Sequence, residues 1–344
     1  MKYGFAPIGV GVAALVTVAM LFTAGWTRPP VQSSQNGYRG TAMDQVANPA
    51  AAARLRAANA LPDPIDKASP DGDRATAVYK NVQVLTDLSA DQFNRVMLAI
   101  TEWVAPQQGC AYCHNVENLA DDGLYTKKVA RRMMQMTRTI NTDWKQHVAA
   151  TGVTCYTCHR GMPVPANIWF HNPGGPHATG FATTNYGMGH PSAVNGTTGL
   201  PGDPFSPLLE GDVASGAIRV EATEALPRGL GASIQTTEQT YALMIHMSES
   251  LGVNCTFCHN TLQFASWDQS TPQRVTAWHG IRLARTLNDT YLSPLTELFP
   301  PNRLGPLGDG PKVNCATCHQ GVNKPLYGVS LAKDYPELGG TPAP

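Results

Sequence analysis

Apolar residues recur at intervals of three and four positions in four stretches of the chain, and this spacing predicts four amphipathic helices. Ser89, followed by Gln92, can cap the first helix, and Pro272 fits the first turn of the fourth. Thr126 and Thr237 are candidate starts of the second and third helices. The apolar positions are, in chain order, Phe93, Val96, Met97 and Ile100; Val129, Met133 and Ile140; Tyr241 and Met244; Val275, Trp278 and Leu283. The chain is therefore expected to be mainly α-helical.

The N-terminus has a different pattern, because no charged residue lies between Lys2 and Arg28. A helix over this segment would be about 37 Å long at roughly 1.5 Å per residue, enough to cross a hydrocarbon core of about 30 Å. We expect residues 1–27 to be a single-pass membrane anchor, with Trp26 at the interface. The alternative is a cleaved secretory signal, whose apolar core is usually shorter. Either interpretation places the rest of the chain on the exported side.

Glycine and proline divide the remainder of the 344 residues, with 32 glycines and 27 prolines in the whole chain. We expect extensive irregular loops between the helices. The expected organisation is an extended tether, a first half, a Gly/Pro-rich connecting segment that contains a short strand pair, a second half and a tail. Their bounds are 28–75, 76–170, 171–232, 233–335 and 336–344.

Charge excludes one class of function. The 25 basic residues are balanced by 25 acidic residues, whereas a nucleic-acid-binding domain needs a net basic surface. Local charged patches that dock a small redox partner remain compatible with this balance.

All eight cysteines lie in four copies of the pattern Cys-x-x-Cys-His. In this pattern two thiols can add to the two vinyl groups of a haem, and the adjacent histidine becomes an iron ligand. A redox dithiol or a zinc site would leave the repeated histidine unexplained. We therefore expect four covalently attached c-type haems, held by Cys110, Cys113 and His114; Cys155, Cys158 and His159; Cys255, Cys258 and His259; Cys315, Cys318 and His319.

The four motifs form two similar pairs. An asparagine directly follows the first and third motifs, whereas a glycine stands two positions after the second and fourth. Residues 138–144 also resemble residues 285–291 in sequence. These signals agree in order and spacing, so we expect a two-haem unit that is used twice.

The helix before each motif can present a sixth iron ligand. Methionine at helical spacing usually fills a core, but each iron also needs a ligand or an open position. The first helix offers Met97; the second offers Met133, Met134 and Met136; the third offers Met244, His246 and Met247. In the fourth helix, Gly280 occupies the position equivalent to Met133, and no methionine lies between residues 275 and 291. The fourth iron must then be open or take a ligand from elsewhere.

These residues resemble the tetrahaem cytochrome c subunit of purple-bacterial photosynthetic reaction centres. The resemblance covers about residues 75–335 and consists of the paired motifs, the three methionine helices and a histidine upstream of the second motif. It implies a multihaem cytochrome with these axial pairs: Met97 and His114 for haem 1, Met133 and His159 for haem 2, Met244 and His259 for haem 3, His147 and His319 for haem 4. No cysteine precedes Cys110, so a lipid on an N-terminal cysteine is excluded and the apolar segment must provide the anchor.

The resemblance also implies a function. The chain would be an electron carrier on the periplasmic side of the bacterial inner, photosynthetic membrane, bound to the reaction-centre membrane subunits. It would pass electrons from a soluble cytochrome c or a high-potential iron–sulfur protein to the photo-oxidised bacteriochlorophyll special pair. Haem 3 would lie nearest that pair, followed by haems 4, 2 and 1.

Three other functions compete with this interpretation. A periplasmic multihaem reductase would need an open iron position, which a complete set of ligands does not offer. A quinol-oxidising membrane cytochrome would rely on histidine rather than methionine for its distal ligands. A freestanding electron-storage cytochrome is the third alternative.

Several other residues carry weaker expectations. Arg138, Arg282 and Arg285 are candidate partners for haem propionates. Side chains inside the motifs are expected to pack on the macrocycles, and the remaining histidines are expected in loops, at the surface or away from the iron. These residues are Tyr112, Tyr156 and Phe257, and His171, His177, His190, His246 and His279.

Overall fold

Helices dominate the computed structural model, which describes residues 6–23, 32–36, 43–170, 203–211, 234–305 and 307–340. The long helices are α1 (Ala6–Thr23), α4 (Ala90–Val104), α5 (Tyr125–Asp143), α9 (Ile234–Leu251) and α10 (Pro272–Leu287). The described residues contain a single antiparallel strand pair, formed by β1 (Gln32–Asn36) and β2 (Met43–Ala47). The predicted mainly α-helical fold is thus confirmed.

Short helical segments connect these elements. The short α-helices are α2 (Pro49–Ala58), α3 (Ala75–Val78), α6 (Lys145–Val148), α7 (Cys155–His159), α8 (Phe205–Leu209) and α11 (Cys315–His319). The 3-10 segments are η1 (Gly109–Tyr112), η3 (Cys255–Phe257), η5 (Ser293–Leu298), η6 (Pro301–Arg303), η7 (Pro325–Gly328), η8 (Ala332–Asp334) and η9 (Pro336–Leu338), and η4 (Asn288–Leu292) is a π-helix.

The predicted helix starts are confirmed for α4 and α10. The Ser89 hydroxyl accepts a hydrogen bond from the Gln92 amide at 3.2 Å, and the Gln92 side chain accepts one from the Ser89 amide at 3.3 Å. This capping box satisfies two amides that would otherwise lack a partner. Helix α10 begins at Pro272, as expected. In contrast, α9 begins at Ile234, ahead of the predicted Thr237.

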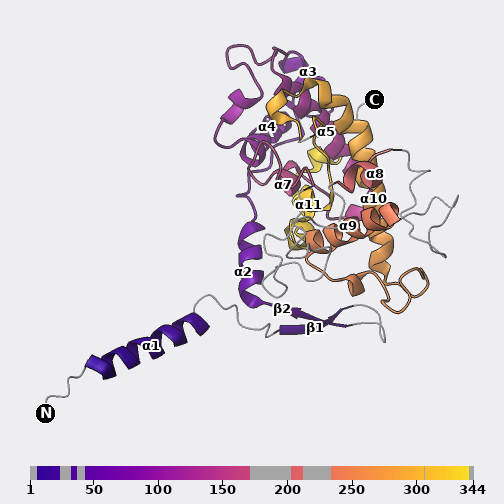
Figure 1. The fold of residues 1–344 in the computed structure, drawn as a ribbon. Helices are drawn as coiled ribbons and strands as arrows, with labels where there is room; N and C mark the ends of the chain where they lie inside the picture. The colour runs from indigo at the N-terminus through magenta and orange to yellow at the C-terminus, as the bar shows by residue number, and fades with distance from the viewer. Residues whose placement is uncertain are drawn as a thin grey trace.

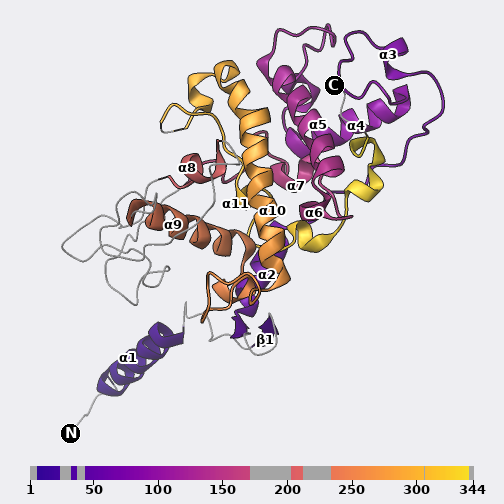
Figure 2. The ribbon, with the colours of Figure 1, turned by 90° about the vertical axis from the view of Figure 1, so that its right-hand side faces the viewer.

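Two groups of helices flank a common centre. In both views, α7 and α11 lie in the middle, with α3, α4 and α5 on one side and α8 and α9 on the other, and α10 runs beside the centre (Figures 1 and 2). Helix α4 packs against α7, and α9 packs against α11 in the same way. Helix α1 projects away from both groups, and its described apolar side chains are exposed. None of the helices in the described part of the chain is both long enough and apolar enough to cross a membrane.

The same asparagine contact occurs once on each side of this centre. The Asn141 amide group donates to the Val153 carbonyl at 2.9 Å, and its oxygen accepts from the Val153 amide at 2.7 Å. The Asn288 amide group makes the same two bonds to Val313, at 3.0 and 2.7 Å. Each pair fixes the valine two positions before α7 or α11. The sequence similarity of residues 138–144 and 285–291 therefore corresponds to an equivalent contact.

The segment at 28–75, predicted to be extended, contains a regular helix. Helix α2 begins after Asn48, whose side-chain oxygen accepts hydrogen bonds from the amides of Ala50 and Ala51. Pro49 suits the first helical position, and the alanines that follow have the highest helix propensity. Part of the segment predicted to be an extended tether is thus helical, because local capping and composition favour a helix here.

The C-terminal residues are also not a free tail up to residue 340. Leu338 is fully buried, and the Glu337 carboxylate lies 3.2 Å from the Arg95 guanidinium, with both side chains almost inaccessible. The Arg138 guanidinium donates to the Glu337 carbonyl at 3.1 Å. The chain therefore returns from the second half to complete the core of the first, a long-range contact that local patterns do not reveal.

The Gly/Pro-rich segment 171–232 is described only at residues 203–211. There, α8 buries Phe205 and Leu209 against Leu243 of α9. The strand pair that we expected in this segment falls outside the described residues.

The buried Arg95–Glu337 pair gives a test of the C-terminal contact. Removing one partner of a buried ion pair costs about 3–5 kcal/mol, so Glu337→Ala is expected to lower the free energy of unfolding by about that amount. Denaturant unfolding of the purified chain measures this. The control is Glu297→Ala, which removes an exposed carboxylate and should leave stability unchanged. Equal stabilities for the two variants would contradict a structural role for the C-terminal return.

Candidate haem sites

The Cys-x-x-Cys-His motifs fold into single helical turns of two kinds. The first and third motifs begin in the 3-10 segments η1 and η3, whereas the second and fourth form the α-helices α7 and α11. Arg160 and Gln320, directly after α7 and α11, have positive φ values of 49° and 47°. The next residue in each case is a glycine, whose amide donates to a carbonyl of α4 or α9: Gly161 to Trp103 at 2.8 Å and Gly321 to Ser250 at 2.7 Å.

In each motif histidine, the ring nitrogen Nδ1 is hydrogen-bonded to a backbone carbonyl. Because a carbonyl oxygen only accepts, Nδ1 must carry the proton and Nε2 has a free lone pair. This arrangement is typical of histidines that ligate a metal. The four pairs are His114 with Leu119 at 3.1 Å, His159 with Met162 at 2.9 Å, His259 with Phe264 at 3.1 Å and His319 with Val322 at 3.0 Å.

Burial favours the neutral form of three of these imidazoles. It lowers the pKa of His159 and of His259, and it lowers the pKa of His319 to about 4. A protonated imidazole has no free lone pair, so a ligand histidine must be neutral. The surroundings of these residues therefore match the state that iron ligation requires.

His147 lies opposite His319. Their ring centroids are 6.0 Å apart and the rings are inclined at 69°. The Nδ1 group of His147 donates to the Thr276 carbonyl at 3.0 Å, so its Nε2 is also free. The two residues predicted to share the fourth iron are thus brought together from α6 and α11.

Gly280 makes the position of His147 possible. A Cβ atom at residue 280 would lie 2.6 Å from Cε1 and 2.9 Å from Nδ1 of the His147 ring. Such distances are far below van der Waals contact, so any side chain at this position would push the ring away. Gly280 of α10 is equivalent in sequence to Met133 of α5. At this position α10 therefore leaves space for the ring of His147, which belongs to α6.

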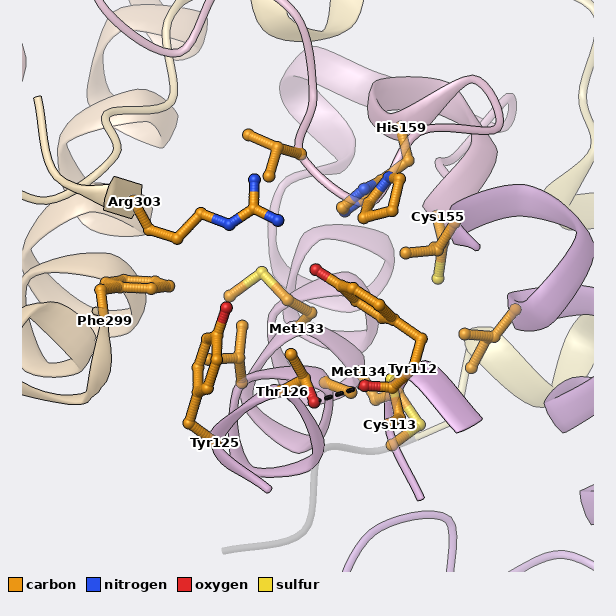
Figure 3. A pocket seen from close by; sticks show the side chains of 16 residues that line it. Tyr112, Cys113, Tyr125, Thr126, Met133, Met134, Cys155, His159, Phe299 and Arg303 are labelled. Carbon is orange, nitrogen blue, oxygen red and sulfur yellow. Dashed lines mark hydrogen bonds between the residues drawn. The ribbon is translucent and has the colours of Figure 1, made fainter. Parts of the chain in front are cut away.

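An apolar cavity of about 660 Å³, including its open mouth, brings three predicted residues of the second site together. Met133 of α5, Cys155 and His159 all line it (Figure 3). The other lining residues are Ile100, Val104, Tyr112, Cys113, Tyr125, Thr126, Val129, Ala130, Met134, Pro163, Val164, Phe299 and Arg303. A thioether, a thiol and a neutral imidazole around an apolar space fit a covalently attached haem.

The other two predicted methionines occupy equivalent helices. Met97 lies on α4 and packs against the buried cluster that contains Val96 and Trp103. Met244 lies on α9 and packs against the cluster of α8 that contains Phe205. Their pairing with the irons of the first and third motifs stays a prediction.

Six of the motif cysteines are free thiols, and two are not. The sulfur atoms of Cys158 and Cys318 are bonded to each other, with Cα atoms 4.4 Å apart. The contact shows that the second and fourth motifs meet at the centre of the molecule.

Two of the predicted propionate partners have other partners instead. Arg138 is buried, and it forms two hydrogen bonds of 2.8 Å with the Asp87 carboxylate. Burial would raise the pKa of Asp87, but the hydrogen bonds and charge of Arg138 lower it below its usual value. The Arg285 guanidinium donates to the Leu208 carbonyl at 2.7 Å. Arg138 thus fixes the loop that carries Asp87, and Arg285 binds helix α8. Arg282 stacks on the Trp278 ring at 4.5 Å.

The remaining histidines and aromatic residues also have local roles. His246 packs against Phe205 with ring centroids 4.7 Å apart, and burial lowers its pKa to about 4. The Tyr156 hydroxyl donates to the Ala60 carbonyl at 2.9 Å. His279 lies against Trp278, whereas His171, His177 and His190 fall outside the described residues.

Sequence reasoning missed the part that Asn59 plays between the two central motifs. Its side-chain oxygen accepts from the Arg160 guanidinium at 3.1 Å, and its amide group donates to the Gln320 carbonyl at 3.4 Å. Asn59 is 4% exposed, and it joins the two residues with positive φ that follow α7 and α11. A single asparagine in an alanine-rich segment gives no signal of such a contact.

Comparisons with known proteins agree with this geometry. The family described as "Photosynthetic reaction centre cytochrome C subunit" matches residues 27–339. The photosynthetic reaction center cytochrome c subunit of Rubrivivax gelatinosus is 52% identical over 95% of this chain and 88% of its own length. The protein of the same description from Thermochromatium tepidum is 46% identical over 94% of this chain and 79% of its own length. The one from Roseobacter denitrificans is 41% identical over 98% of this chain and 93% of its own length. The chain therefore belongs to the family of photosynthetic reaction centre cytochrome c subunits.

Proposed function

We propose that this chain passes electrons from a soluble periplasmic carrier, through four covalently attached c-type haems, to the photo-oxidised bacteriochlorophyll special pair. The carrier would be a small cytochrome c or a high-potential iron–sulfur protein. As a member of its family, the chain is an electron carrier of photosynthesis rather than an enzyme. The observation that carries the proposal is the recurrence, at all four motifs, of a histidine whose Nδ1 is fixed and whose Nε2 is free.

The proposed axial pairs follow the sequence expectations. Met97 and His114 would hold haem 1, Met133 and His159 haem 2, Met244 and His259 haem 3, and His147 and His319 haem 4. When bound, each haem supplies one-electron chemistry, and a methionine ligand raises its potential relative to a second histidine. The chain's own contribution is to orient these ligands, to exclude water and to set the local charge.

The organisation proposed for the chain is a two-haem unit used twice, joined at the contact of α7 and α11. The equivalent contacts of Asn141 and Asn288 support this. So do the equivalent amide bonds of Gly161 and Gly321. The return of residues 336–340 means that the core of the first unit is completed by the end of the chain.

The charge-free segment 3–27 is proposed to anchor the chain in the photosynthetic membrane, next to the reaction-centre membrane subunits. The exposure of the described apolar side chains of α1 supports this. The haem-bearing part would lie on the periplasmic side.

Flash spectroscopy of native membranes tests the proposed function. Oxidation of a c-type haem, followed at its α band, is expected within microseconds of the flash and should disappear when the gene is deleted. Deletion should leave the photo-oxidation of bacteriochlorophyll itself intact, which serves as the control. Membranes that show the same fast haem oxidation without this chain would refute the proposal.

Gly280→Ala tests the proposed ligand of the fourth iron. The added methyl group would overlap the His147 ring, so the variant is expected to lose the bis-histidine ligation of one iron. That iron, once reduced, should then bind carbon monoxide, which is measured by difference spectroscopy of the purified complex.

The control for this test is Gln273→Ala, at an exposed position of the same helix, which should bind no carbon monoxide. Alanine has a higher helix propensity than glycine, so weakening of α10 would not explain the effect. A Gly280→Ala protein that keeps all its axial ligands would rule out His147 as the ligand in this position.

A further inference from the structure

Arg303 places a positive charge in the wall of the cavity that contains Met133, Cys155 and His159. Figure 3 shows its guanidinium directed into the cavity, on the side to which the Tyr112 phenol oxygen points. Arg303 belongs to η6 in the second half of the chain, whereas Met133, Cys155 and His159 belong to the first. Nothing in the motif pattern pointed to this residue.

Local structure holds Arg303 in this position. The segment contains two successive prolines, and the Arg303 amide donates to the Pro300 carbonyl at 2.8 Å to close a 3-10 turn. Just before the turn, the Phe299 ring meets the Tyr125 ring edge-on, with centroids 6.4 Å apart. This aromatic contact attaches the segment to the start of α5, so Arg303 reaches across from one half to the other.

The charge of Arg303 has no counter-charge in the described part of the chain. Its side chain forms no ion pair or hydrogen bond with another described residue, and the residues that line the cavity include no carboxylate. The more deeply buried arginines differ in this respect, because Arg95 pairs with Glu337 and Arg138 with Asp87. An arginine that faces an apolar space needs an anionic partner to offset its desolvation.

The described residues around the cavity do not supply that anion. The described lining residues include phenols, thiols and an imidazole, but no aspartate or glutamate. The described lining therefore leaves a place for an anion carried by the molecule that fills the cavity.

We propose that Arg303 pairs with a propionate of the haem attached through Cys155 and ligated by Met133 and His159, and that it raises the midpoint potential of that haem. A guanidinium and a carboxylate form strong, charge-assisted hydrogen bonds. The ferric haem carries one more positive charge than the ferrous haem, so a nearby cation disfavours oxidation. Arg303 is a positioning and tuning residue rather than an iron ligand. This inference rests on the haem assignment proposed above.

Redox titration of the purified complex tests the role of Arg303. The first step is to identify the haem: Met133→His should lower the midpoint potential of one spectral component, which marks the haem ligated by Met133. Arg303→Gln, which removes the charge, is then expected to shift that same component to a lower potential. Arg303→Lys, which keeps the charge, should retain a potential between those of the wild type and the glutamine variant.

The matched control is Arg54→Gln, which removes an exposed arginine from α2 and should leave the component unchanged. A shift in Arg303→Gln no larger than in this control overturns the proposal, as does a lysine variant with a potential at or below that of the glutamine variant. If the glutamine variant holds fewer haems than the wild type, the lysine variant decides: a large negative shift there overturns the proposal. Failure of Met133→His to move any component would instead refute the haem assignment.

Discussion

The hydrogen bond from a histidine Nδ1 to a nearby carbonyl is the interaction on which the sites of this molecule depend. It fixes the tautomer and the direction of the ring before any metal is considered, and it leaves Nε2 free. In the second and fourth motifs the accepting carbonyl is three residues after the histidine, whereas in the first and third it is five residues after it. The two geometries match the two kinds of motif turn, so the local backbone decides where each imidazole points.

His147 extends this arrangement to a residue outside the motifs. Its carbonyl partner, Thr276, lies on α10, more than a hundred residues away in the chain. The ring fits against α10 only because residue 280 has no side chain. The fourth site thus needs residues from both halves of the chain. The same holds for the cavity of the second site, because Arg303 belongs to the second half. Asn59 and the C-terminal residues add further contacts between distant segments, so the stability of each site depends on the whole fold.

Local signals in the sequence predicted much of this structure. The capping box at Ser89 and the proline at residue 272 marked the starts of α4 and α10, and the four motifs marked the candidate haem sites. The similarity of residues 138–144 and 285–291 anticipated the equivalent contacts of Asn141 and Asn288. Long-range contacts could not be predicted in this way. Arg138 was a candidate propionate partner, and its pairing with the Asp87 carboxylate was not foreseen because Asp87 is remote in sequence. The burial of Glu337 and the reach of Arg303 likewise follow from chain topology, which periodicity does not encode.

We propose that the iron site of the paired histidines His147 and His319 differs in its ligands from three sites that each contain a methionine. The most direct measurement is near-infrared magnetic circular dichroism of the fully oxidised complex, because the charge-transfer band of low-spin ferric haem distinguishes methionine from histidine as the sixth ligand. The account predicts three irons with methionine and histidine and one with two histidines, the last signal being lost in His147→Ala. Four methionine signals, or a bis-histidine signal that survives in His147→Ala, would contradict it.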